Sequence, residues 1–368
     1  MKILAVFGTR PEAIKMCPLV KKLRNEEAME CCVCLTGQHT EMLVQVMEVF
    51  HVKEDYNLNI MKKGQTLTEV TINILSRLEK VVVKEKPELI LVHGDTSTAF
   101  TGALAGFYLG VPVGHVEAGL RTYNMKAPYP EEFNRQAVDL ITELYFAPTE
   151  EAKENLLSEG KKAEKIFVTG NTVIDALRLT VRENYENEYI NWAKGSRLIL
   201  FTAHRRENIG APMRHMFRAL QRVIQDFPDV KVIYPIHKNL AVREIAEEVL
   251  GKIERIRMIE PLDVIDFHNF MAKSYLVLTD SGGVQEEAPS MGIPVLVMRE
   301  TTERPEGVKA GTIKLVGTGE ETIYQGVKCL LEDKEVYQKM NKAVNPYGDG
   351  HASERIITAI KHYKKNWC

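Results

Sequence analysis

The chain has little excess charge, no long apolar run and no disulfide pattern. Its 368 residues include 48 Lys and Arg against 50 Asp and Glu, which leaves a net charge of −2. This balance argues against a surface for nucleic acid or an anionic membrane. No apolar stretch is long enough to span a bilayer, and Met1–Phe7 is too short for the core of a signal peptide. We expect a cytoplasmic protein whose first strand is Met1–Phe7.

The six cysteines do not form a disulfide framework. Cys31 and Cys34 have the CxxC spacing of metal and redox sites, but they lie in a strand-like run, Glu30–Thr36. Residues three apart on a strand face opposite sides of the sheet, so these two cannot hold one metal ion together. We therefore expect buried free thiols.

A dinucleotide fingerprint is also absent from the first strand-to-helix turn, where Gly8 is followed by Thr-Arg-Pro with no GxGxxG pattern. Thr9 and Glu12 instead have the spacing of a helix capping box. Arg10 and Lys15 bring two cations to the carboxyl end of a strand, where open α/β sheets bind ligands. We interpret these two side chains as anion-binding residues.

Apolar strand-like runs alternate with helix-like stretches along the whole chain, which predicts parallel sheets covered by helices. A polar, irregular segment at 183–196 separates two such series and suggests a domain junction. We predict a first domain over residues 1–170, joined by a C-terminal helix at 352–368. Residues 171–351 are predicted to form the second domain.

Three carboxylates stand at strand ends or helix starts of the first domain. Asp95 and Glu117 each follow a short apolar strand, and Glu131 precedes Arg135 by one helical turn. Each acid alone is typical of a helix cap or a surface pair. Because the carboxyl ends of parallel strands share one rim, we expect the three acids to converge there. Such a cluster indicates acid–base chemistry.

A metal site is the alternative for this rim, because His93 and His115 each stand two residues before an acid, Asp95 or Glu117. Alternation along a strand places each histidine on the same side as its acid but deeper in the sheet. That geometry disfavours a shared metal ion.

The stretch Leu276–Pro289 predicts a nucleotide site in the second domain. A short apolar strand is followed by Ser281-Gly282-Gly283, which opens a helix. Two glycines let the backbone approach a ligand, and the positive end of a helix favours a phosphate or diphosphate. Glu287, about one turn later, is placed to accept hydrogen bonds from ribose hydroxyls. An ordinary strand-to-helix turn with a capping Ser281 is the alternative.

His204 lies in a loop after the strand at 197–201, beside Arg205 and Arg206. The field of two arginines is expected to favour the neutral imidazole, and this setting makes His204 a candidate active-site residue. A nucleotide site in the second half and acids in the first half together describe the GT-B fold. We therefore predict an α/β protein with two Rossmann-like domains and a central cleft that holds the ligand.

Eight motifs run in order from the first strand to the last helix. They are Gly8-Thr9-Arg10-Pro11-Glu12-Ala13-Ile14-Lys15, His93-Gly94-Asp95, His115-Val116-Glu117-Ala118-Gly119-Leu120-Arg121, Pro130–Arg135, Thr202–Asn208, Asp280–Pro289, Thr301–Glu306 and Asn345–Gly350. Together they resemble the bacterial non-hydrolysing UDP-N-acetylglucosamine 2-epimerases. The resemblance implies a homodimer that interconverts UDP-N-acetylglucosamine and UDP-N-acetylmannosamine without NAD or metal. It also implies that UDP is first expelled to give a 2-acetamidoglucal and then added back, and that the product supplies surface polysaccharide synthesis.

The same resemblance implies roles for individual residues. UDP would be held by Arg10, Ser281, Gly282, Gly283, Glu287 and Arg304, with His204 beside the diphosphate and with Phe267 and the backbone of Leu262 flanking uracil. The sugar would be surrounded by Lys15, Asp95, Glu117, Glu131 and Arg135. Which carboxylate removes the C2 proton stays open at this point.

A second UDP-N-acetylglucosamine site, which regulates the enzyme, is also implied by the family. The positions that resemble this site are Gln38, Gln65, Glu131, Arg205 and His237. Glu41 stands where family members can have an amide, and Gly64 where they can have an arginine. Since both changes disfavour a diphosphate, we expect UDP-N-acetylglucosamine to activate the reverse reaction only at a higher concentration.

Two other functions use similar features. A GT-B glycosyltransferase would use the same UDP site, but nothing in the sequence marks an acceptor site and three acids crowd the sugar side. A UDP-sugar sensor would bind without turnover, and the intact set of acids argues against it.

Overall fold

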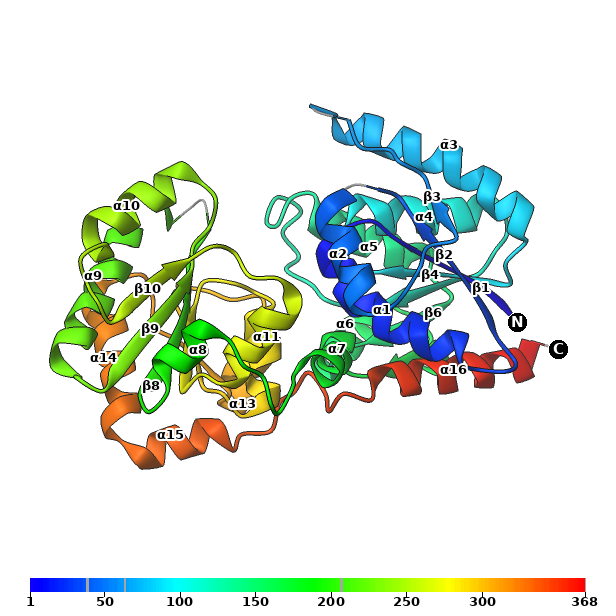
Figure 1. Cartoon of the computed structure of the whole chain (residues 1–368). Helices are drawn as coiled ribbons and strands as arrows, with labels where there is room; N and C mark the ends of the chain where they lie inside the picture. The colour runs from blue at the N-terminus through cyan, green and yellow to red at the C-terminus, as the bar shows by residue number, and fades with distance from the viewer. Residues whose placement is uncertain (38–39, 63, 206–207, 368) are drawn as a thin grey trace. The chain divides into compact units, whose positions relative to one another are not determined.

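The computed structural model of the chain describes residues 1–37, 40–62, 64–205 and 208–367, and for 40–42 and 365–367 it describes the backbone only. The chain forms two compact units (Figure 1). Unit 1 comprises Met1–Leu179 and Tyr347–Cys368, and unit 2 comprises Thr180–Pro346. The chain thus passes between the units after residues 179 and 346. The sequence analysis instead placed these boundaries after residues 170 and 351.

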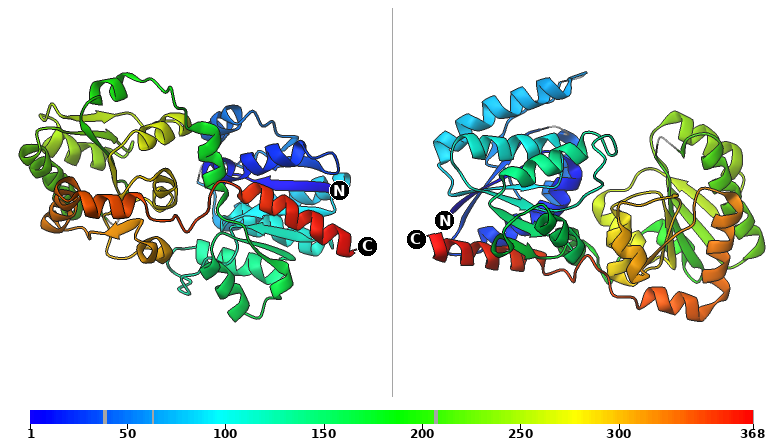
Figure 2. Two further views of the ribbon diagram at one scale, coloured as in Figure 1. Left: turned by 90° about the horizontal axis from the view of Figure 1, so that it is seen from below. Right: turned by 180° about the vertical axis from the view of Figure 1, so that it is seen from behind.

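Unit 1 is built on a seven-stranded parallel sheet with the strand order β3-β2-β1-β4-β5-β6-β7. Its strands are β1 (Lys2–Phe7), β2 (Glu30–Leu35), β3 (Tyr56–Asn57), β4 (Leu89–His93), β5 (Val113–Val116), β6 (Leu144–Ala147) and β7 (Ile166–Val168). Its helices are α1 (Arg10–Arg24), α2 (Thr40–Val49), α3 (Leu67–Glu85), α4 (Ser97–Tyr108), α5 (Glu131–Ile141), α6 (Glu150–Ser158), η1 (Ala163–Lys165), α7 (Thr172–Thr180) and α16 (Ala352–Trp367). Helices α3 and α4 cover one side of the strands, and α16 lies along α1 on the other side (Figures 1 and 2).

Unit 2 contains a six-stranded parallel sheet with the order β10-β9-β8-β11-β12-β13. Its strands are β8 (Arg197–Thr202), β9 (Val230–Pro235), β10 (Ile256–Ile259), β11 (Leu276–Thr279), β12 (Val295–Val297) and β13 (Ile313–Leu315). Its helices are α8 (Glu188–Ala193), α9 (Ala211–Asp226), α10 (Leu240–Leu250), α11 (Val264–Ala272), α12 (Val284–Glu287), η3 (Ala288–Met291), α13 (Pro305–Ala310), α14 (Glu320–Glu332) and α15 (Lys334–Asn341). Helix α8 lies in the segment that the sequence predicted to be irregular.

The central strands are continuous apolar runs because both faces of each parallel sheet are covered by helices. Cys31 and Cys34 lie in β2 and are buried, and burial raises the pKa of each thiol to about 12. The prediction of buried free thiols is confirmed for these two residues. Among the helices that the structure describes, none combines the length and apolar character that a bilayer span requires.

The strand order reverses at the β1/β4 pair in unit 1 and at the β8/β11 pair in unit 2. Open α/β sheets bind ligands outside the carboxyl ends of the strands at such a switch point. The first pair is followed by the turns that carry Arg10 and Asp95, and the second pair by those that carry His204 and Ser281. The topology therefore places predicted site residues at both switch points.

Candidate active site

Hydrogen bonds of Glu12 connect the turn after β1 to the turn after β4. Its carboxylate accepts hydrogen bonds from the amides of Gly8 at 2.9 Å and Thr9 at 2.7 Å, and from the hydroxyl of Thr96 at 2.5 Å. Burial raises the pKa of Glu12 despite these bonds. A Cβ atom on Gly8 would lie 1.8 Å from Thr36 Oγ1, so only glycine fits this turn. The bonds fix the start of α1.

Asp95 follows β4 and pairs with a buried arginine. Thr96 caps α4, since its Oγ1 accepts from the amide of Ala99 at 3.0 Å, and this leaves the Asp95 carboxylate to form an ion pair with Arg135 of α5. Arg135 is 6% exposed and also lies 3.3 Å from Glu132. The sequence placed Arg135 on one helix face with Glu131, whereas its ion-pair partner within the described helix is Glu132.

Glu117 follows β5 in the left-handed backbone region, with φ of 68°. A residue other than glycine is strained there, and strain of this kind is concentrated at functional sites. Its carboxylate forms an ion pair with Lys15 of α1 and accepts a 2.7 Å hydrogen bond from Asn171 Nδ2. Both ends of the Lys15 ion pair are mostly buried, with side-chain exposures of 12% and 8%. A cation and an amide therefore both contact this carboxylate.

Glu131 is the first residue of α5 and is half-buried. No ion pair of Glu131 is found in the described part of the chain, whereas Asp95 and Glu117 each face a cation. The turn that carries Asp95 also approaches Glu117, because a Cβ atom on Gly94 would lie 3.6 Å from Glu117 Oε1. The three predicted acids thus differ in their electrostatic surroundings.

The two histidines of this rim do not form a metal site with the acids. His115 Nδ1 lies 2.6 Å from Asp139 and its Nε2 lies 2.7 Å from the carbonyl oxygen of Gly94, so both ring nitrogens are occupied. His93 Nε2 lies 3.7 Å from Glu117. Over residues 1–37, 40–62, 64–205 and 208–367, no group of three or more His, Cys, Asp or Glu side chains has the arrangement of a metal site.

The burial of His93 predicts that the free energy of unfolding depends on pH. Burial lowers its pKa to about 3, so the folded chain leaves this ring neutral where the unfolded chain protonates it, below about pH 6.5. This contribution to stability is full above pH 6.5 and is lost as the pH falls toward 3. We expect the His93→Gln variant to lose about 2 kcal/mol less unfolding free energy than the wild type between pH 7 and pH 5. Urea titrations at both pH values measure the difference, and equal losses would contradict it.

Asp280, at the end of β11, organises the loop after β8. It is fully buried, and its carboxylate accepts from the amides of His204 and Arg205, each at 3.0 Å, and from Asn208 Nδ2 at 3.1 Å. The ring of His204 lies 3.3 Å from the carboxylate of Asp280, whereas the sequence analysis considered only the two neighbouring arginines. Arg206 lies outside the described residues. Sequence reasoning missed this role of Asp280.

The Ser281–Gly283 turn leads into α12, which has only four residues before the 3₁₀ helix η3. The dipole of so short a helix is weaker than the sequence suggested. A Cβ atom on Gly282 would lie 2.8 Å from Glu303 Oε1, so the Glu303 side chain closely approaches the backbone at this glycine. Glu287 is the last residue of α12, and its side chain is 13% exposed, 3.9 Å from His268.

Two further acids, which the sequence analysis did not single out, hold the arginines of this rim. Arg304 Nε donates to the buried carboxylate of Glu286 at 2.7 Å, and Arg205 lies 3.3 Å from Glu303. Burial opposes ionisation of Glu303, but the guanidinium groups of Arg304 and Arg299 outweigh it and lower its pKa to about 2. Both carboxylates orient guanidinium groups near the Ser281 turn.

The residues assigned to uracil lie nearby in the chain. Phe267 is half-buried in α11, whose first turn is capped by Asp263, with Oδ1 accepting from the Asp266 amide at 2.8 Å. Leu262 is half-buried immediately before this cap. Neither position is fully buried, so both can contact a ligand.

Of the five predicted regulatory residues, Glu131 and Arg205 are described above, which leaves Gln38, Gln65 and His237. Gln38 and the side chain of Glu41 lie outside the described residues. His237 follows β9 and stacks on His204, with ring centroids 6.0 Å apart. Gln65 Oε1 accepts from the amide of Lys62 at 2.7 Å, and its neighbour Gly64 has φ of 78° with open space around it.

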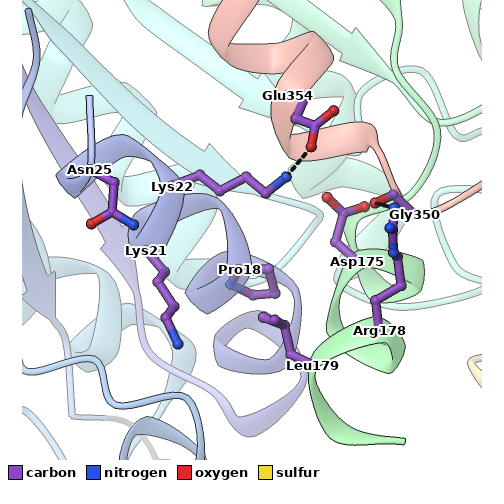
Figure 3. A pocket seen from close by; sticks show the side chains of 9 residues that line it. All are labelled: Pro18, Lys21, Lys22, Asn25, Asp175, Arg178, Leu179, Gly350 and Glu354. Atoms are coloured by element: carbon purple, nitrogen blue, oxygen red, sulfur yellow. Dashed lines mark hydrogen bonds and ion pairs between the residues drawn. The ribbon is translucent and has the colours of Figure 1, made fainter. Parts of the chain in front are cut away.

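A pocket of about 380 Å³ in unit 1 lies away from these residues, where α1, α7 and α16 meet (Figure 3). Figure 3 shows Lys22 reaching toward Glu354 of α16. Asp175 accepts from the first amides of α16, at 3.1 Å and 2.9 Å, and Arg178 donates to the carbonyl oxygen of Gly350 at 3.2 Å. These contacts attach α16 to α1 and α7, and we interpret them as structural.

Comparison with known proteins identifies relatives along almost the whole chain. The family model for UDP-N-acetylglucosamine 2-epimerase matches residues 21–361. The chain is 57% identical over 364 residues to a UDP-N-acetylglucosamine 2-epimerase of Bacillus subtilis, covering 99% of this chain and 96% of that protein.

Solved structures agree with this match. A structure described as a UDP-N-acetylglucosamine 2-epimerase from Listeria monocytogenes has 53% identity and a TM-score of 0.94, covering 99% of this chain and 97% of that one. The Neisseria meningitidis enzyme bound to UDP-N-acetylglucosamine has 46% identity and a TM-score of 0.90, with coverage of 98% and 100%. With the two parallel sheets, this likeness confirms the predicted GT-B fold.

Proposed function

The chain belongs to the UDP-N-acetylglucosamine 2-epimerase family, a family of isomerases, and we propose that it interconverts UDP-N-acetylglucosamine and UDP-N-acetylmannosamine by eliminating and re-adding UDP. The observation that carries this proposal is that the chain has both an acid rim, in unit 1, and a nucleotide-type turn, in unit 2. The Neisseria meningitidis relative, which binds UDP-N-acetylglucosamine, supports the choice of substrate.

The chemistry of C2 explains why the diphosphate must leave first. The hydrogen on C2 is not next to a carbonyl group, so a side-chain base cannot remove it directly. Breaking the bond between C1 and the diphosphate develops positive charge on the ring, and this charge acidifies the C2 proton. Loss of that proton gives a 2-acetamidoglucal, and protonation on the opposite face followed by return of UDP inverts C2.

We assign the nucleotide to the rim of unit 2, with Arg10 of unit 1 as a further cation. The groups proposed for UDP are Arg10, His204, Leu262, Phe267, Ser281, Gly282, Gly283, Glu287 and Arg304. Cations stabilise the charge that develops on the leaving diphosphate. The ion pairs from Glu286 and Glu303 support this assignment, because they fix guanidinium groups in advance of binding.

We assign the sugar to the carboxylates of unit 1, with Lys15 and Arg135 beside them. Asp95 and Glu117 each form an ion pair with a mostly buried cation, and the negative charge of these two carboxylates would stabilise the oxocarbenium ion. Glu131 forms no ion pair among the described residues, whereas the carboxylates of Asp95 and Glu117 are each engaged by a cation. We therefore propose Glu131 as the residue that exchanges the proton at C2.

The proposal is tested by supplying UDP-N-acetylglucosamine alone. The expected result is a second sugar nucleotide in the proton NMR spectrum, formed without any added cofactor, until the two reach equilibrium. Turnover that requires an acceptor and releases UDP would instead indicate a glycosyltransferase. Binding without any conversion would indicate a sensor.

We also propose that the enzyme is a cytoplasmic homodimer that supplies N-acetylmannosamine for surface polysaccharides, as the family resemblance implies. Size-exclusion chromatography with light scattering tests the dimer. A monomeric mass at assay concentrations would overturn that part of the proposal.

Regulation by a second UDP-N-acetylglucosamine is proposed at Gln38, Gln65, Glu131, Arg205 and His237. The stacking of His237 on His204 supports a link to the nucleotide rim. With pure UDP-N-acetylmannosamine as substrate we expect a lag that a little UDP-N-acetylglucosamine abolishes. Since Gly64 has a left-handed backbone, Gly64→Arg is compared with Gly64→Ala, which carries the same strain without the cation. The arginine is expected to shorten the lag relative to alanine, and a curve without any lag would contradict the regulatory site.

A further inference from the structure

Asn171 is a buried amide at the N-terminus of α7 that the roles above do not use. It is 3% exposed, and its hydrogen bonds include three of different kinds. Its backbone amide donates to the carbonyl oxygen of Tyr347 at 2.7 Å, and its Oδ1 accepts from the amide of Val173 at 3.0 Å. Its Nδ2 donates to Glu117 Oε2 at 2.7 Å.

The helix cap fixes which way this side chain faces. Because Oδ1 is taken by the Val173 amide, the donor Nδ2 must face Glu117. The backbone of Asn171 is fixed as well, by the close approach of two glycines. A Cβ atom on Gly170 would lie 3.3 Å from Gly348 Cα, and one on Gly348 would lie 3.1 Å from Gly170 Cα.

The segment around Tyr347 is where the chain re-enters unit 1 after unit 2. Asn171 thus connects that re-entry point, the start of α7 and the carboxylate of Glu117. Glu117 needs such support, since its own backbone is in the left-handed region and the flexible stem of Lys15 alone does not fix its direction.

We propose that Asn171 is a positioning residue, which holds the Glu117 carboxylate in one orientation and in its ionised form during the reaction. The inference rests on the proposed epimerase function and deepens it. A hydrogen-bond donor favours the charged carboxylate, whereas an acceptor at the same place would oppose it.

Two substitutions separate this role from the helix cap. Asn171→Ser and Asn171→Asp both keep a side-chain oxygen that caps α7 well. Serine removes the amide that reaches Glu117, and aspartate puts a second carboxylate beside it. Asn187 is the matched control, since it caps α8 in the same way, with Oδ1 accepting from the Tyr189 amide at 2.9 Å, and it has no role in the proposed site.

The measurement is the pH profile of kcat and kcat/KM for each variant, together with its thermal midpoint. We expect Asn171→Ser to lower kcat about tenfold or more with little change in KM, the direction for a lost transition-state contact. Asn171→Asp is expected to move the acid limb of the profile upward by about one pH unit or more. Both variants are expected to melt close to the corresponding Asn187 variants.

The outcomes separate this inference from the proposed function. If the wild type converts substrate but the Asn171 variants match the Asn187 variants in kcat and in pH profile, Asn171 is only a helix cap. The same holds if kcat falls in proportion to folded protein with an unshifted acid limb. If the wild type does not convert UDP-N-acetylglucosamine, the epimerase proposal itself fails.

Discussion

The Glu117→Gln variant is expected to turn over UDP-N-acetylglucosamine at least about a hundredfold more slowly than the wild type, the scale for losing an essential acid–base or charged group. The substitution keeps the shape of the side chain but removes the negative charge that faces Lys15 in a mostly buried site. It removes one charged partner of that cation and one of the carboxylates that we propose to stabilise the oxocarbenium ion. Affinity for UDP should change little, because the UDP groups of unit 2 are untouched.

Steady-state rates and calorimetric UDP affinities measure the two effects. Glu150→Gln is a suitable control, since Glu150 begins α6 as an exposed acid that forms an ion pair with Lys153. A Glu117→Gln rate within a few-fold of the control would show that Glu117 has a structural role alone. A parallel loss of UDP affinity would place Glu117 with the nucleotide and contradict our assignment.

The Asp280→Ala variant is expected to lose UDP affinity by tenfold or more. Asp280 accepts hydrogen bonds from the amides of His204 and Arg205 and from the side chain of Asn208, so its removal frees the segment that carries His204, the residue proposed to lie beside the diphosphate. Three donors, one in a buried hydrogen bond and two in part-buried ones, also lose their acceptor. We therefore expect the free energy of unfolding to fall by about 3 kcal/mol.

Asp333→Ala in unit 2 provides the comparison, because Asp333 caps α15 and accepts from two backbone amides at 2.9 Å and 3.1 Å. That variant should lose about 1 kcal/mol of stability and keep its UDP affinity. Calorimetry on folded protein and urea titration separate the two effects. Normal UDP affinity in Asp280→Ala would show that the loop after β8 does not hold the diphosphate.

Local patterns in the sequence were enough to predict most of the fold. The capping box of Thr9 and Glu12 is present in the structure. The alternation of apolar runs with helix-like stretches predicted parallel sheets, and the structure has two of them. Strand ends are visible in a sequence because buried runs stop at polar residues. The positions of Asp95 and Glu117 after strands followed from this alone.

Partners distant in sequence were not predictable in the same way. The ion pair of Arg135 with Asp95 joins residues 40 apart, and the hydrogen bond of Asn171 to Glu117 joins residues 54 apart. Spacing within one helix suggested Glu131 as the partner of Arg135. Such spacing rules do not include residues from other elements, such as Asp95 in the turn after β4. The short length of α12 was not predicted either, but here the cause is local. The helix changes to a 3₁₀ turn at Pro289, which has no backbone N–H to continue the α-helical hydrogen bonds.

The central claim is that the C2 hydrogen is lost and replaced during turnover. The direct measurement is a proton NMR time course of the enzyme with UDP-N-acetylglucosamine in D2O, without added NAD or metal. The account predicts that the C2 proton signal disappears from both sugar nucleotides as the second one forms, because the hydrogen returned to C2 comes from solvent. A second sugar nucleotide that forms while C2 keeps its protium in both species would contradict the account.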